Sequence, residues 1–109
     1  MALIVQKYGG TSVGSVERIK NVAARVKRTR DAGHQVVVVV SAMAGETNRL
    51  VKLAYEIDPD PISREYDMLL ASGEQVSTAL VALALNKMGV PSRSLLAHQI
   101  DFRTDATYS

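Results

Sequence analysis

The residues best suited to chemistry stand near the N-terminus, where Lys7 is followed by Gly9, Gly10 and Gly14. Glycines let the backbone approach an anion closely, free N–H groups bind it, and a lysine adds a full positive charge. The lysine precedes the glycines, which excludes the P-loop pattern, and the glycine spacing excludes the dinucleotide-binding pattern. This stretch therefore predicts a phosphate or carboxylate site of another design.

The elements that must position this site are a strand before it and a helix after it. The apolar run in Ala2–Gln6 predicts a strand covered on both faces. The helix is expected over Ser15–Ala32, with Ser15 as N-cap and Gly33 as its stop. Its apolar stripe is predicted to contain Val16, Ile19, Val22, Ala23 and Val26.

The second predicted strand, Gln35–Val40, ends in five consecutive valines and is expected to be buried on both faces and central. A strand, a helix and a strand at this spacing predict a right-handed βαβ unit with parallel strands. Ligands of such sheets gather beyond the carboxyl ends of the strands. We therefore expect residues 7–10 and 41–45 to lie together.

The next part of the chain reads as helical. Thr47–Ile57 predicts a second helix, with Leu50, Leu53, Ala54 and Ile57 at helical spacing. The aspartates and prolines of residues 58–61 predict a turn in preference to a metal site.

Beyond that turn, Ile62–Ala71 predicts a short helix, and Ser72 is expected to start another one that is buried over Val76–Leu85 and ends at Gly89. Pro91–Leu96 is a weaker strand candidate, and residues 104–107 are a turn candidate.

Composition limits the class of protein. The 109 residues are 47% hydrophobic and 22% charged, with a net charge of +2, which is ordinary for one soluble domain. This charge, with four tyrosines and one phenylalanine as the only aromatic residues, argues against nucleic-acid binding. The chain has no cysteine, and its histidines, His34 and His98, stand alone, so no metal site is expected. Short apolar runs and the lack of a signal-peptide pattern predict a cytoplasmic protein that does not enter a membrane.

Three blocks of sequence, Val5–Gly14, Val40–Leu50 and Asp67–Ser77, together resemble the motifs of aspartate kinases in the amino acid kinase family. The resemblance implies ATP-dependent phosphorylation of L-aspartate to 4-phospho-L-aspartate, with Mg²⁺ carried by the nucleotide. It implies a three-layer α/β/α sandwich with a mainly parallel sheet, of which residues 1–109 are the N-terminal half. The nucleotide-binding half, the ACT regulatory domains and the surfaces of a homo- or hetero-oligomer are then expected outside these residues.

The resemblance assigns site residues, each of which has a plainer alternative. Lys7 and Glu74 are expected to be catalytic, Lys7 by bridging the γ-phosphate and the attacking carboxylate, and Glu74 by orienting the α-ammonium of aspartate. The expected phosphate-binding residues are Lys7, Tyr8, Gly9, Gly10 and Ser41, and the expected substrate-binding residues are Thr47 and Glu74.

The alternatives are structural. Lys7 reads also as a surface lysine, Gly9 and Gly10 as a tight turn, and Ser41 and Thr47 as helix caps. Glu74 reads also as an acid that the dipole favours in the first turn of a helix. Two other functions stay open: another amino acid kinase, acting on glutamate, N-acetylglutamate or a nucleoside monophosphate, or a non-catalytic aspartate-binding or assembly module.

Overall fold

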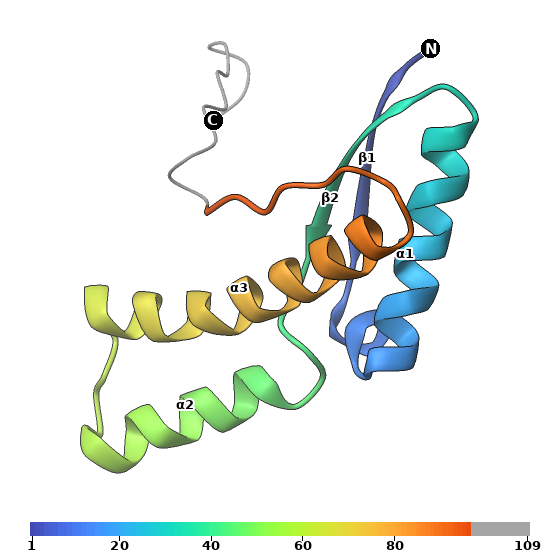
Figure 1. The fold of residues 1–109 in the computed structure, drawn as a ribbon. Coiled ribbons are helices and arrows are strands. Elements are labelled where there is room, and N and C mark those ends of the chain that lie inside the picture. Colours follow the sequence, from blue (N-terminus) through green and yellow to red (C-terminus); the bar gives the residue numbers. More distant parts are fainter. Residues whose placement is uncertain (97–109) are drawn as a thin grey trace, which may run out of the picture.

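The computed structural model describes residues 1–96 of the chain, and Figure 1 shows the order of its elements. These elements are strand β1 (Leu3–Tyr8), the 3₁₀ helix η1 (Gly10–Val13), helix α1 (Val16–Asp31), strand β2 (Gln35–Val40), helix α2 (Glu46–Ile57) and helix α3 (Arg64–Lys87). The described part is therefore of the mixed α/β class, as predicted.

The two strands pair in parallel along their whole length, from Leu3 opposite Gln35 to Tyr8 opposite Val40. Helix α1 forms the connection between them, which confirms the predicted βαβ unit. Because both strands run in the same direction, the loops after Tyr8 and after Val40 leave the sheet at one edge.

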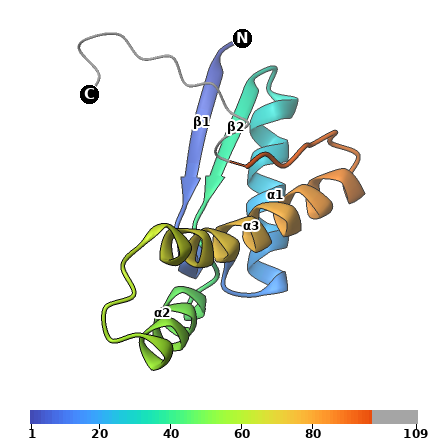
Figure 2. The same ribbon diagram turned by 90° about the vertical axis from the view of Figure 1, so that its left-hand side faces the viewer.

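One face of the sheet carries the core. Helices α1 and α3 pack there and contact each other as well as β2 (Figure 2). The core consists mainly of aliphatic side chains, with Val13, Ile19, Val22, Ala23, Val26, Val40, Val81, Leu85 and Val90 buried.

The opposite face of the sheet is open among residues 1–96. Leu3 is 65% exposed, Val5 59% and Val39 42%, so the prediction that both strands are covered on both faces was wrong here. The physical reason is that both helices that contact β2 lie on the same side of a two-stranded sheet. Of the three layers of the expected α/β/α sandwich, residues 1–96 thus form two, the sheet and one layer of helices.

Helix α1 follows its predicted capping. The Ser15 side chain accepts a hydrogen bond from the Arg18 backbone N–H, and Gly33 takes a φ of 96° just beyond the helix. Only glycine adopts that backbone conformation without strain. Val16 was wrongly placed on the buried stripe, because it is 62% exposed at the first turn.

Helix α3 is continuous, so the predicted break at Ser72 was wrong. Its N-cap is Ser63, which accepts a hydrogen bond from the Tyr66 N–H, while Ser72 donates its hydroxyl back to the Leu69 carbonyl. Gly73 lies inside this continuous helix, at a point where Ala42 packs closely against it.

Only one stripe of α3 is buried, at Gly73, Ser77, Val81 and Leu85. The expectation of a helix buried all round was wrong, since Leu83 is 64% exposed. By length and composition α3 is apolar enough to cross a membrane. A single helix of this kind is weak evidence for a membrane span, and the buried stripe of α3 packs against α1, α2 and β2.

The remaining expectations divide. Helix α2 begins after Gly45 and buries Leu50 and Ala54, but the predicted stripe residues Leu53 and Ile57 are 42% and 88% exposed. The turn at 58–61 is confirmed, with the Asp60 N–H bonded to the Asp58 carboxylate. Residues 91–96 form no strand. His98 and the turn candidate at 104–107 lie outside the described residues.

Candidate active site

The turn after β1 presents three backbone N–H groups in a row. The carbonyl oxygens of Gly9, Gly10 and Thr11 all accept hydrogen bonds, at 3.1 Å from Ser12, 3.1 Å from Ala44 and 3.2 Å from Gly14 respectively. Within residues 1–96, the N–H groups of these same three residues have no acceptor. Their acceptors are satisfied and their donors are free, which is the arrangement of an anion-binding turn.

Lys7 lies inside β1 and pairs with Val39, whereas the predicted strand ended one residue before it, at Gln6. Side chains alternate along a strand, so Lys7 shares the open face of the sheet with Leu3 and Val5. Its amine forms no ion pair or hydrogen bond with any described residue. A full positive charge is therefore available on the strand that leads into the turn with the three free N–H groups.

Tyr8 points to the other side of the sheet. Its hydroxyl donates a 2.7 Å hydrogen bond to Gln6, whose amide in turn donates to Thr29 of α1 at 2.9 Å. Only the backbone of Tyr8 faces the second motif, where its carbonyl accepts from the Ser41 N–H at 3.0 Å.

The loop after β2 is held directly against this turn. Ala44 donates to the Gly10 carbonyl at 3.1 Å, and a Cβ atom on Gly10 would lie 2.8 Å from the Ala42 carbonyl oxygen. Ser41 is exposed next to the turn and caps no helix. The expected meeting of residues 7–10 with 41–45 is confirmed.

Thr47 is the second residue of α2 and is exposed. The N-cap of α2 is Gly45, with a φ of 84°, so the alternative of Thr47 as a cap was wrong. Its side chain is free for another role at the start of the helix.

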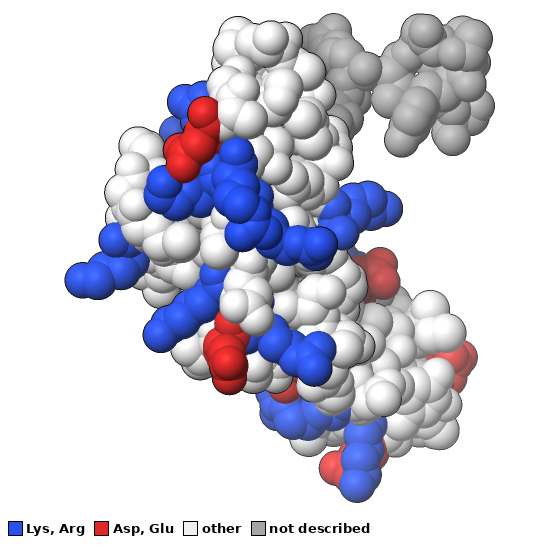
Figure 3. Space-filling model, turned by 90° about the vertical axis from the view of Figure 1, so that its right-hand side faces the viewer, with Lys and Arg blue, Asp and Glu red and all other residues white. Residues whose placement is uncertain are grey.

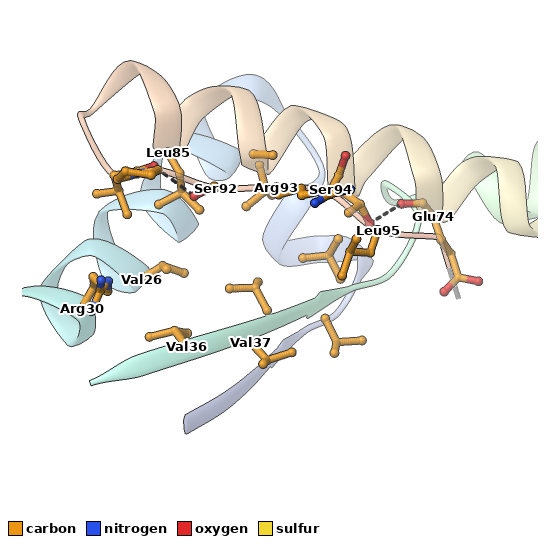
Figure 4. A pocket seen from close by; sticks show the side chains of 18 of the residues that line it. Val26, Arg30, Val36, Val37, Glu74, Leu85, Ser92, Arg93, Ser94 and Leu95 are labelled. Atoms are coloured by element: carbon orange, nitrogen blue, oxygen red, sulfur yellow. Dashed lines mark hydrogen bonds between the residues drawn. The ribbon is translucent and has the colours of Figure 1, made fainter. Parts of the chain in front are cut away.

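Helix α3 brings the third motif to the same place. A Cβ atom on Gly73 would lie 3.0 Å from the Ala42 Cβ and 3.3 Å from the Leu50 Cδ1. Glu74 is exposed and lines a cavity of about 550 Å³ between β2 and α3, together with Val39 and Val40 (Figure 4). Its side chain extends from α3 toward the side on which β2 lies.

Glu74 is not in the first turn of a helix, since α3 begins at Arg64. The helix-dipole alternative for this carboxylate was therefore wrong. Its position still brings it to the edge of the sheet where the turn at Gly10 lies, because the preceding residue, Gly73, packs on Ala42, and the loop that contains Ala42 contacts Gly10.

Charge is distributed unevenly around the site. The outer face of α1 is rich in lysine and arginine (Figure 3), with Lys27 paired to Asp31 at 2.6 Å. At the start of α2, Arg49 holds Glu46 through two hydrogen bonds and lowers the pKa of that carboxyl below its usual range. Within residues 1–96, no three histidine, cysteine or acidic side chains are placed to hold a metal.

Sequence reasoning missed the two small residues that allow the motifs to meet, Ala42 and Gly73. The available signal was their small size, because each is a residue without a polar side chain inside a motif that is otherwise rich in functional groups. It missed the Glu46–Arg49 pair as well, although acid and arginine three residues apart in a helix are a common signal for one.

Comparison with known proteins places this geometry in a family. The profile of the Amino acid kinase family matches residues 2–109. An aspartate kinase (Ask_LysC) of Stutzerimonas stutzeri is 56% identical over 109 residues, which is 100% of this chain and 26% of that protein. An aspartokinase of Thermus thermophilus is 51% identical over 108 residues, 99% of this chain and 27% of that protein.

A solved structure agrees with the sequence relatives. The crystal structure of aspartate kinase from Synechocystis superposes with a TM-score of 0.83 at 60% identity, over 85% of this chain and 16% of that chain. The chain thus spans about a quarter of the length of the curated relatives it matches. With a matching profile over nearly all its residues and the three motifs joined at one edge of a parallel sheet, the chain belongs to the amino acid kinase family.

Proposed function

We propose that residues 1–109 form the aspartate-side part of an aspartate kinase, which transfers the γ-phosphoryl group of ATP to the β-carboxylate of L-aspartate. The observation that carries the proposal is the turn that follows Lys7: among residues 1–96, the N–H groups of Gly9, Gly10 and Thr11 have no acceptor and the Lys7 amine has no partner. The relatives named aspartate kinase, at 51 to 60% identity, support the choice of substrate.

The chemistry requires charge neutralisation more than proton transfer. A carboxylate oxygen of aspartate attacks the γ-phosphorus, a new P–O bond forms, and the bond to the oxygen bridging the β- and γ-phosphorus breaks. ADP leaves with that electron pair, and 4-phospho-L-aspartate is the product. Both reactants are anions, so positive groups at the transferring phosphoryl lower the barrier.

The residues divide these tasks. Lys7 lies between the two anions and reduces their repulsion, while the N–H groups of Gly9 and Gly10 hold the phosphoryl oxygens. The exposed hydroxyl of Ser41 adds a donor to the phosphates. Thr47 and Glu74 bind aspartate, with the Glu74 carboxylate against its α-ammonium. No general base is needed, because the nucleophile is already ionised.

The described residues fit the phosphates of ATP but not a metal of their own. The free donors and Lys7 suit an anion, whereas no cluster of metal ligands accompanies them in residues 1–96. We infer that Mg²⁺ arrives with the nucleotide and supplies charge neutralisation at the phosphates. The adenine site, oligomer contacts and allosteric control belong to parts other than residues 1–109. In the cell the product would enter lysine, threonine and methionine synthesis in the cytoplasm.

A coupled ADP-release assay on the complete polypeptide that contains these residues tests the proposal. L-Aspartate, L-glutamate, N-acetyl-L-glutamate and a nucleoside monophosphate are each offered with ATP and Mg²⁺. ADP release with L-aspartate alone is expected. Faster ADP release with any of the other three acceptors would show that it, and not aspartate, is the substrate of this amino acid kinase. No release with any of the four would refute the kinase activity.

A further inference from the structure

The contact between Gly73 and Ala42 joins two of the three motifs by shape alone. Neither residue has a polar side chain, and the space between them is so short that a Cβ on Gly73 would lie 3.0 Å from the Ala42 Cβ. Real Cβ atoms very seldom approach so closely, so an added methyl group must push one segment away. Ala42 is buried, and α3 cannot retreat freely because Ser77 and Val81 of the same stripe are buried too.

The contact stands between the residues proposed to act on substrate. Ala42 follows Ser41 directly, and its carbonyl oxygen is the atom that a Cβ on Gly10 would meet first, at 2.8 Å. Gly73 precedes Glu74 directly. Ala42 therefore touches the proposed phosphate-binding turn on one side and, on the other, helix α3, which carries the Glu74 carboxylate.

We propose that Gly73 and Ala42 are positioning residues, whose methyl-sized contact sets where the Glu74 carboxylate stands relative to the turn at Gly10. This inference rests on the proposed function and adds two residues to it that touch neither substrate. An added methyl group at Gly73 requires a shift of a few tenths of an ångström between α3 and Ala42. Because a misplacement of about 1 Å can cost about 10²-fold, this smaller shift of Glu74 is expected to cost about tenfold in affinity for aspartate.

The test is a double-substitution cycle in the complete enzyme. Gly73→Ala places a methyl group on each side of the contact, and Ala42→Gly leaves no methyl group there. Each substitution alone is therefore expected to raise the aspartate KM by about tenfold. The double variant moves one methyl group across the contact and is expected to return the aspartate KM to within about threefold of wild type. The ATP KM is expected to change less than the aspartate KM, because α3 carries Glu74 and none of the proposed phosphate-binding residues.

Ala79→Gly is the matched control. Ala79 lies on the exposed side of α3, so its replacement lowers helix propensity without changing the contact with Ala42. It is expected to lower Tm while leaving the aspartate KM unchanged. If Gly73→Ala does not fold, Ala42→Gly and the double variant carry the comparison.

Three outcomes overturn the inference: a folded Gly73→Ala or Ala42→Gly variant with the wild-type aspartate KM, a double variant no better than the singles, or equal shifts in the KM of both substrates. These differ from failure of the proposed function, which would show as a wild-type enzyme that does not phosphorylate aspartate and would refute both.

Discussion

Gly10 lies so close to Ala42 that any side chain at position 10 would meet the Ala42 carbonyl oxygen, since a Cβ there would stand 2.8 Å from it. The neighbouring Gly9 has nothing within 4 Å of the same position. The two adjacent glycines therefore differ: Gly10 permits the close approach of two loops, whereas the position of a side chain at Gly9 is open space.

This difference predicts that one added methyl group destabilises the protein at position 10 but not at position 9. Gly10→Ala is expected to lower the free energy of unfolding by about 1–3 kcal/mol, because the added carbon meets backbone that cannot rotate away. Gly9→Ala, whose φ of −78° suits alanine, is expected to stay within about 0.5 kcal/mol. Urea denaturation of both variants measures this, and equal losses would show that the close approach is not tight in solution.

Removal of the Lys7 charge is expected to reduce kcat of the complete enzyme by about 10²–10³-fold in Lys7→Ala. The aspartate KM should change much less, because the charge acts mainly on the transition state. Steady-state kinetics measures the split. Lys20→Ala, on the exposed face of α1, is the control and should be neutral; a near-normal kcat in Lys7→Ala would remove the lysine from the mechanism.

Glu74→Gln keeps the shape of the side chain and removes its charge. The aspartate KM is expected to rise by at least about tenfold, since a charge-assisted bond to the α-ammonium is lost. Calorimetric titration of the complete enzyme with aspartate measures the same loss as a binding affinity. Glu56→Gln on exposed α2 serves as the matched control, and equal affinities in both variants would place Glu74 outside the substrate site.

The Glu46–Arg49 pair predicts a dependence on pH. Arg49 lowers the pKa of Glu46 in the folded chain below the model-compound value of 4.5, chiefly by hydrogen bonding to the ionised form. The pair's contribution to stability is thus present above about pH 4.5 and disappears as the pH falls through the lowered folded-state pKa.

NMR titration of the Glu46 carboxyl group checks this directly. Its pKa should rise toward the ordinary value in Arg49→Gln, and the difference in stability between wild type and variant should vanish in acid. A Glu46 pKa that is the same in both proteins would show that the pair does not persist in water.

Two serines of α3 predict opposite effects of the same substitution. The Ser77 hydroxyl is fully buried and has no hydrogen-bond partner among residues 1–96, so Ser77→Ala is expected to be neutral or stabilising by up to about 1 kcal/mol. Ser63 caps the helix, so Ser63→Ala should cost about 1 kcal/mol. Thermal unfolding of both measures the signs, and a destabilised Ser77→Ala would reveal a partner for that hydroxyl.

The βαβ unit could be predicted because its signals are local. The valine run, the Ser15 cap and the Gly33 stop each follow from residues within one turn of their neighbours, and the structure confirms all three as strand, cap and stop. The meeting of the two loops then followed from topology alone.

Helix α3 could not be predicted correctly, because its path depends on a distant loop. Ser72 and Gly73 carry the local signals of a helix boundary, yet Gly73 is the point where α3 packs on Ala42. The role of a small residue as a contact surface is visible only when its partner is in place. For the same reason, the depth of burial of Val16 and Leu83 depended on neighbours that periodicity does not reveal.

The uncovered valines also bear on how such a protein is synthesised. Val37 is 37% exposed and Val39 42% exposed on a strand that has β1 as its only partner among residues 1–96, so β2 presents apolar side chains together with a free edge. In relatives about four times as long, this half of the sheet leaves the ribosome well before the rest of the polypeptide. During that interval β2 is a template for pairing with another nascent chain, and chaperone binding at this strand is the expected safeguard.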